Sequence, residues 1–144
     1  MTTTRPGHEP TTRSPVNVDV AIDVNDLPRM KTFWEATLGY SQVRAGDSYS
    51  YLLDPTGRGP HLFLQLVPER RTEKNRLHLD VVVPSLKDAV ESAESRGAVV
   101  LREVTTPITH FVVVEDPEGN QFCLVDEEYW EQTRPPYWEV RSAE

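Results

Sequence analysis

Apolar and polar positions alternate over residues 16–24, which predicts a strand with one buried and one polar face. A helix should follow, because Asn25 or Asp26 can cap its start, Pro28 suits its first turn and Gly39 suits its end. Its apolar positions recur at helical spacing: Leu27, Met30, Phe33, Trp34 and Leu38. Three strand-like pieces come next, over residues 40–44, 49–53 and 61–67, with Asp54-Pro55-Thr56-Gly57 as the turn between the last two.

The same order of elements returns in the second half of the chain. Residues 76–83 alternate again, with the apolar positions Leu77, Leu79, Val81 and Val83 on one face, and Ser85 with Asp88 can cap a helix that closes at Gly97. Three more strand-like segments cover residues 99–104, 110–115 and 121–125, and Asp-Pro-x-Gly again precedes the last of them. We predict an α+β fold of two βαβββ modules, 16–68 and 76–126, joined by the polar linker 69–75.

The two ends of the chain differ from these modules in composition. Residues 1–15 are almost free of apolar side chains, so we expect a disordered leader there. Residues 127–144 form an aromatic extension, which should dock on the domain because exposed aromatic rings forgo the free energy of apolar burial. We favour an extension that covers the edge of a sheet or forms a contact in a homodimer over one that forms a lid on a cavity. The rings concerned are Tyr129, Trp130, Tyr137 and Trp138.

Polar residues gather on one face of the first and last strand of each module. Spread over a surface they would be ordinary solvated side chains, but two such sheets placed side by side would bring them around one shared cavity. Carboxylates, imidazoles, amides and a thiol in a cavity are unlike a core, because unpaired buried polar groups are costly. We therefore expect a ligand-binding cleft lined by Asp19, Asp23, His61, Phe63, Gln65, His78, Asp80, Gln121 and Cys123.

Composition and charge narrow the classes of partner. The 144 residues suit one domain, and 15 Lys and Arg against 23 Asp and Glu give a formal net charge of −8. Such a charge disfavours nucleic acid and membrane surfaces as partners, so a small molecule is expected. The single cysteine excludes an intrachain disulfide, and no apolar stretch approaches the roughly 20 residues of a membrane span. We expect a soluble, cytoplasmic protein.

The motifs together resemble the glyoxalase, bleomycin-resistance and extradiol dioxygenase superfamily, also called the vicinal oxygen chelate superfamily. They are Phe33-Trp34 with Leu38-Gly39-Tyr40, the stretch Asn75-Arg76-Leu77-His78-Leu79-Asp80-Val81, and Asp116-Pro117-Glu118-Gly119-Asn120-Gln121-Phe122-Cys123. The match is nearest to glyoxalase-like domains without an assigned reaction. It implies that the two modules form an incomplete barrel around a central cleft.

The resemblance also implies where a metal would bind. In the superfamily's metal enzymes the first and last strands of both modules supply the ligands, and these positions fall on Asp19, Gln65, His78 and Cys123. Only His78 keeps the usual identity, since Gln65 and Cys123 stand where glutamates are usual. Glyoxalase I chemistry needs a carboxylate base there, so that activity is not expected. A divalent ion held by these residues would be zinc, iron, nickel or manganese.

Two functions remain open at this point. In the first, a glyoxalase-like enzyme of lyase, isomerase or dioxygenase type uses His78, Asp19 and Gln65 to bind a metal or polarise a substrate oxygen. In the second, a metal-free protein of the bleomycin-resistance type binds an aromatic or cationic small molecule in an acidic, aromatic-lined cleft. His78 is then a wall residue with a hydrogen-bond partner, and Cys123 is a small buried apolar side chain.

Overall fold

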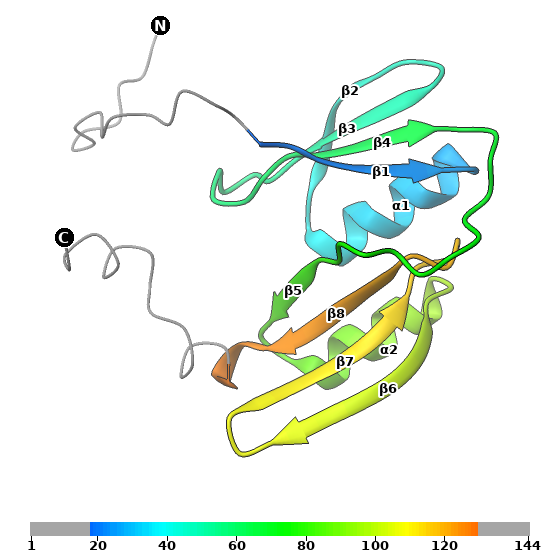
Figure 1. The fold of residues 1–144 in the computed structure, drawn as a ribbon. Coiled ribbons are helices and arrows are strands. Elements are labelled where there is room, and N and C mark those ends of the chain that lie inside the picture. The colour runs from blue at the N-terminus through cyan, green and yellow to red at the C-terminus, as the bar shows by residue number, and fades with distance from the viewer. Residues whose placement is uncertain (1–17, 130–144) are drawn as a thin grey trace, which may run out of the picture.

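Two modules of identical topology make up residues 18–129, the part of the chain that the computed structural model describes (Figure 1). The first contains β1 (Val20–Val24), α1 (Leu27–Leu38), β2 (Ser41–Ala45), β3 (Tyr49–Leu53) and β4 (Leu62–Leu66). The second contains β5 (Asp80–Val83), α2 (Leu86–Ser95), β6 (Val99–Thr106), β7 (Thr109–Glu115) and β8 (Gln121–Asp126). The expected leader 1–15 and the extension beyond Tyr129 lie outside the described residues.

Each module forms its own mixed four-stranded sheet. The strand orders are β1-β4-β3-β2 and β5-β8-β7-β6, and in both sheets the first strand pairs in parallel with the last strand of its module. The remaining neighbours are antiparallel. Within the described residues the two sheets remain separate and close no barrel. The predicted α+β fold of two βαβββ modules in an incomplete barrel is therefore confirmed.

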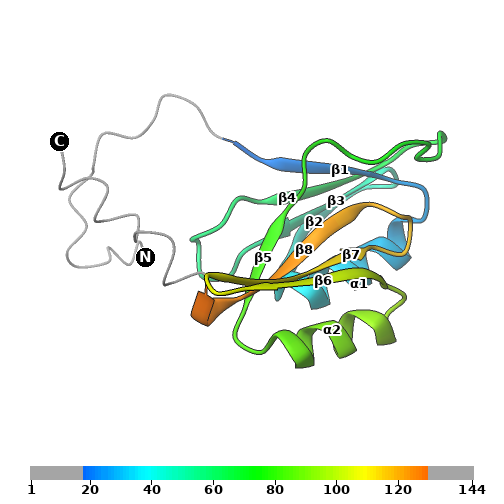
Figure 2. The ribbon, with the colours of Figure 1, turned by 60° about the horizontal axis from the view of Figure 1, so that its bottom comes forward.

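Both helices pack on the same side of the two sheets, so no helix of residues 18–129 covers the opposite side, which we call the open face (Figures 1 and 2). The apolar positions of the strands face the helices, and the core extends through both modules without a break. Trp34 of α1 joins them, because its ring centroid lies 4.8 Å from that of Phe122 on β8. Phe33 adds edge-on contacts to both rings, at 5.3 and 6.0 Å.

Short polar side chains start both helices as the sequence predicts. The Asp26 carboxylate accepts a hydrogen bond from the Arg29 N–H, and the Ser85 hydroxyl accepts one from the Asp88 N–H. Gly39 ends α1 with φ 69°, a left-handed conformation that suits glycine. Neither helix of the described residues is long and apolar enough to span a membrane.

The predicted alternation extends too far at the start of each module. Val18 is 75% exposed and Leu77 is 90% exposed, although both were expected on the buried face. The reason is that β1 begins only at Val20 and β5 only at Asp80. Before β5, the Asn75 side chain takes the place of a strand partner, because its amide both accepts from and donates to the Gln121 backbone.

Candidate functional site

A cavity of about 660 Å³ lies at the seam between the two modules. It opens there because β1 and β5 belong to separate sheets and form no hydrogen-bonded ladder with each other. We call it the seam cavity. Its volume falls within the usual range for small-molecule sites. Its walls combine polar side chains of the open faces, namely Asp19, Asp23, His78 and Gln121, with the core residues Ile22, Trp34, Leu79 and Phe122.

Only part of the expected cleft lines this cavity. The expected residues in and just before β4 lie outside it, as do Asp80 and Cys123. The cleft was expected on the faces of the sheets that point away from the helices, whereas the open seam also lets the cavity reach apolar side chains of the core. The expected residues that do not line it are His61, Phe63, Gln65, Asp80 and Cys123.

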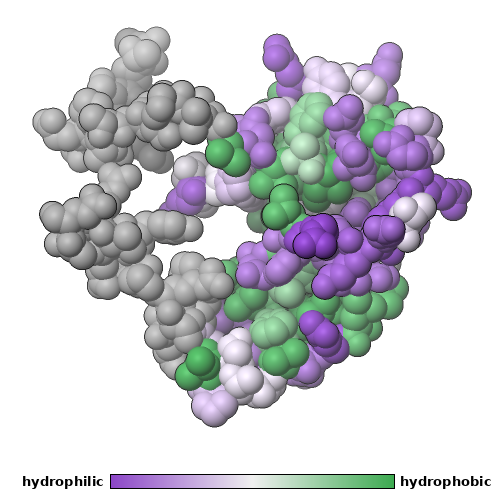
Figure 3. Space-filling model, viewed as in Figure 1, coloured by the Kyte–Doolittle hydropathy of each residue, from purple (hydrophilic) through white to green (hydrophobic). Residues whose placement is uncertain are grey.

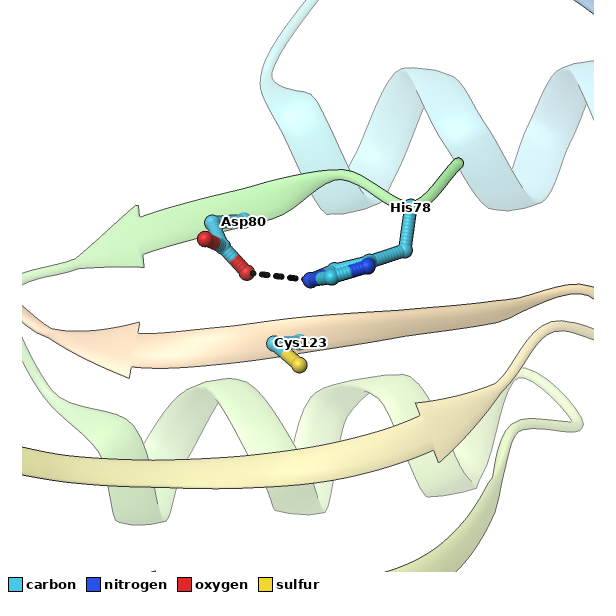
Figure 4. A group of neighbouring side chains, drawn as sticks. All are labelled: His78, Asp80 and Cys123. Carbon is cyan, nitrogen blue, oxygen red and sulfur yellow. Dashed lines mark ion pairs between the residues drawn. The ribbon is translucent and has the colours of Figure 1, made fainter. Parts of the chain in front are cut away.

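Three potential metal ligands gather on the open face of the second sheet (Figure 4). His78 precedes β5, Asp80 begins it, and Cys123 lies opposite Asp80 on the parallel strand β8. The His78 Nε2 lies 3.3 Å from the Asp80 Oδ1, and one donor atom from each residue lies within 4.8 Å of the others. We call this group the donor cluster. Since His78 also lines the seam cavity, the cluster adjoins the cavity.

The Cys123 thiol is held in its protonated form. Burial, followed by the negative charge of Asp80, raises the pKa of Cys123 to about 11, although the positive charges of Arg102 and Lys74 oppose this rise. A metal ion would have to displace the thiol proton in order to bind sulfur. Nitrogen, carboxylate oxygen and sulfur donors together fit zinc or iron, and three protein ligands would leave a coordination position for a substrate.

Asp19, on the opposite wall, already has a partner within the protein. Its carboxylate accepts a hydrogen bond from the hydroxyl of Tyr51 on β3, and that hydrogen bond raises the pKa of Tyr51. Gln65 lies opposite Asp23 on neighbouring strands of the first sheet. Of the four ligand positions implied by the resemblance, the donor cluster contains two, His78 and Cys123, and its third member is Asp80.

Aromatic rings cover the open face of the first sheet beside Asp19. Tyr49 stacks on Phe63 with ring centroids 5.6 Å apart, and Tyr51 meets Phe63 and His61 edge-on at 5.7 and 5.6 Å. Tyr51 was absent from the expected site residues. The alternation of residues 49–53 held the signal, since it places Tyr51 on the same face as Tyr49.

Loop residues also line the seam cavity, and no periodic pattern in the sequence marks them. Arg70, Arg71 and Asn75 come from the linker between β4 and β5, and Glu118 comes from the turn between β7 and β8. The Glu118 carboxylate accepts hydrogen bonds from the backbone N–H groups of Asn25 and Asp26, at 2.6 and 2.8 Å. This turn of the second module therefore attaches to the start of α1 in the first.

Paired βαβββ modules with a cavity between their first strands define the class of vicinal oxygen chelate proteins. The chain belongs to the glyoxalase-like domain family, whose model matches residues 19–125. The predicted resemblance to this superfamily is thus confirmed. No curated protein matches the chain in sequence.

Solved structures of low sequence identity share the fold. A glyoxalase/bleomycin resistance protein/dioxygenase family enzyme from Burkholderia phytofirmans PsJN is 18% identical with a TM-score of 0.65, over 76% of this chain and 98% of that one. A glyoxalase/bleomycin resistance protein from Albidiferax ferrireducens T118 is 21% identical with a TM-score of 0.60, over 81% and 97%. The fosfomycin resistance protein FosX from Listeria monocytogenes is 13% identical with a TM-score of 0.66, over 79% and 94%.

Proposed function

We propose that this protein is a metal-assisted enzyme of lyase or isomerase type, acting on a small molecule in the seam cavity. The observation that carries the proposal is the double position of His78, which lines the cavity and belongs to the donor cluster. A metal ion held by His78, Asp80 and Cys123 would therefore lie beside a bound substrate. When bound, such an ion supplies Lewis-acid stabilisation of negative charge on a substrate oxygen.

Residues of the chain itself would position the substrate and move protons. Asp19 lines the cavity and accepts the Tyr51 hydroxyl proton in a hydrogen bond, so this pair can exchange a proton with a substrate group. Trp34 and Phe122 form an apolar wall that excludes water from one side. Gln65, as an amide, and Cys123, as a protonated thiol, are poor bases at neutral pH, so we do not propose glyoxalase I chemistry.

A structural neighbour supports a divalent ion in this fold. A mutant of the Listeria monocytogenes FosX protein, 14% identical to this chain with a TM-score of 0.65, was crystallised with Mn(II) and 1S,2S-dihydroxypropylphosphonic acid. The thiol in the present donor cluster favours zinc or iron over the harder Mn²⁺.

Metal analysis of protein purified without chelator tests the proposal. We expect near-stoichiometric zinc or iron, and release of about one proton from Cys123 when zinc is added to metal-free protein at pH 7. His78→Ala and Cys123→Ser should each weaken zinc binding strongly. The loss should exceed the factor of about 10 to 100 that is typical when a residue hydrogen-bonded to a metal ligand is removed. His110→Ala is the matched control, because His110 also pairs with a carboxylate, Glu103, at 2.8 Å, but lies outside both cavity and cluster.

Metal-free binding of a small molecule is the second candidate function. It is favoured by the state of two of the expected ligands, since Asp19 already bonds to Tyr51 and the Cys123 thiol is protonated. In that case added zinc neither binds stoichiometrically nor raises the melting temperature, and His78→Ala weakens ligand binding equally with and without metal. Either result contradicts the metal-assisted enzyme.

A further inference from the structure

Basic residues concentrate in the chain segment beside the seam cavity, between β4 and β5. Arg70, Arg71, Lys74 and Arg76 occupy four of seven consecutive positions, in a chain whose acidic residues outnumber its basic ones by 23 to 15. The side chains of Arg70 and Arg71 line the cavity. Figure 3 shows a hydrophilic band between the two sheets, where Figure 1 places this linker. Because Arg70 and Arg71 outnumber Glu69 on the cavity wall that this linker forms, that wall carries a net positive charge within an acidic protein.

The two cavity arginines form no ion pair with a carboxylate of the described residues. The ion pairs within 4.0 Å there involve Lys31, His78 and His110 instead. Arg71 is held in place, because its Nη1 donates to the Glu73 carbonyl oxygen at 2.6 Å and its guanidinium packs against Gly119. A positioned guanidinium without an internal anion can bind one from solution through two parallel N–H donors.

Two of the four cavity carboxylates are already engaged. Glu118 accepts two backbone N–H groups, and Asp19 accepts the Tyr51 hydroxyl. The other two, Asp23 and Glu69, are exposed. Their charge disfavours a polyanion in the same cavity, whereas they can accept hydrogen bonds from hydroxyl groups of a ligand.

We infer that the ligand of the seam cavity is a small hydroxylated organic anion whose carboxylate or phosphonate group is bound by Arg70 and Arg71. This inference rests on the proposed function in that it concerns the same cavity, but it requires no metal. It places the anionic group at the linker wall and leaves the hydroxyl-bearing part of the ligand facing Asp23 and, at the edge of the cavity, His78.

The test uses two anionic fragments, glycolate and methylphosphonate, with glycolamide as the neutral counterpart. Fragments of this size can reach the arginines whatever the rest of the natural ligand looks like. Each is titrated into metal-free protein at constant ionic strength, and backbone amide shifts of residues 69–78 are followed by NMR. We expect saturable shifts with both anions or with one, which identifies the acid group, and at least about tenfold weaker binding of glycolamide.

Variants localise the effect. The double variant Arg70→Gln/Arg71→Gln should weaken anion binding at least about tenfold, and Arg70→Lys/Arg71→Lys should restore part of it, because lysine keeps the charge but loses the planar pair of donors. Arg58→Gln, an exposed arginine outside the cavity, should change nothing. The same NMR spectra report whether each variant is folded.

Three results would overturn the inference: no saturable shift in the linker, equal binding of glycolamide, or unchanged anion binding in the glutamine double variant. Repeating the titration with zinc present and in His78→Ala separates this inference from the proposed function. Anion binding that depends on zinc and His78 but not on the arginines would leave the metal proposal standing alone. Anion binding that depends on the arginines in a protein that takes up no zinc would support this inference and contradict the proposed metal-assisted function.

Discussion

Glu118 and Asn25 lie 93 positions apart in the chain, and the carboxylate of the first accepts the backbone N–H of the second at 2.6 Å. The other carboxylate oxygen accepts the N–H of Asp26, the residue that caps α1. The corresponding turn of the first module has Thr56 at this position, which bonds within its own turn to Asp54. The internal symmetry of the fold is thus broken at a contact that joins the modules beside the seam cavity.

Removing this contact should loosen the two modules. We expect Glu118→Ala to lower the free energy of unfolding by about 1–2 kcal/mol, because a charged acceptor of two N–H groups near a helix N-terminus is lost. Glu118→Gln should lose about half of that, since one amide oxygen remains to accept. Urea denaturation measures both, with the exposed α2 residue Glu91→Ala as control. A Glu118→Ala protein as stable as the control would contradict a linking role.

The thiol of Cys123 should make the protein less stable in alkali. Its pKa is raised from 9.0 to about 11 in the folded state, so between these values the folded state holds more protons than the unfolded state. Stability therefore falls as pH rises through this window, by about 2–3 kcal/mol in total, and is unaffected below it. Thermal melts of wild type and Cys123→Ala from pH 8 to about 11 check this.

The difference between the two proteins, rather than either curve, is the relevant quantity, because tyrosines titrate in the same range. Tyr40 and Tyr51 are present in both proteins, and their contribution cancels. Parallel curves for wild type and Cys123→Ala would mean that the thiol is not buried against Asp80. In metal-free protein at neutral pH the same thiol should react slowly with disulfide reagents and rapidly only after unfolding.

Asp54 should make the protein less stable in acid. Its carboxylate accepts hydrogen bonds from Gly59, Thr56 and Arg58, and these lower its pKa to about 2. The stabilisation is complete above the ordinary value of 3.8 and is lost as pH falls from there through about 2. Because the group is partly exposed, we expect at most about 1 kcal/mol. Comparing Asp54→Ala with wild type between pH 6 and 2 tests this.

The equivalent aspartate of the second module serves as an internal contrast. Asp116 also accepts hydrogen bonds from its own turn, yet burial outweighs them and raises its pKa. Its contribution therefore has the opposite sign, and stability falls as pH rises through the raised pKa. An acid-dependent loss of stability that persists in Asp54→Ala would assign the effect to a carboxylate other than Asp54.

The fold was predictable from the sequence because the same local patterns of strands, caps and turns occur in both modules. Alternating apolar and polar residues predicted the first strand of each module, and Asp26 and Ser85 cap the helices as expected. The same alternation placed Asp80 and Cys123 on one face, and the register pairs their Cα positions. Leu77 was misplaced because alternation assumes a strand partner, and Asn75 replaces that partner with a side chain.

The shape of the cavity could not be predicted in this way. It depends on how two separate sheets lie relative to each other, which no period within one strand encodes. Glu118, Arg70 and Arg71 reach it from loops, where side-chain direction follows from tertiary contacts rather than from spacing. The loop residues that line the cavity beside β1 and β5 can therefore be identified only from a structure.

Asn75 connects the linker arginines to the second sheet, and its loss should affect both stability and binding. Its Oδ1 accepts the Gln121 N–H at 2.7 Å, and its Nδ2 donates to the Gln121 carbonyl oxygen at 2.9 Å. Asn75→Ala leaves both backbone groups without these partners, which should cost about 1–3 kcal/mol. Asn75→Asp keeps the acceptor but loses the donor, so its stability should fall between those of Asn75→Ala and wild type.

Hydrogen exchange of the Gln121 amide measures this attachment directly, and it should accelerate in Asn75→Ala and stay slow in Asn75→Asp. If Arg71 is positioned through this attachment, glycolate binding should be weakest in Asn75→Ala and intermediate in Asn75→Asp. Unchanged exchange at Gln121 would show that β8 holds its first residue without the linker.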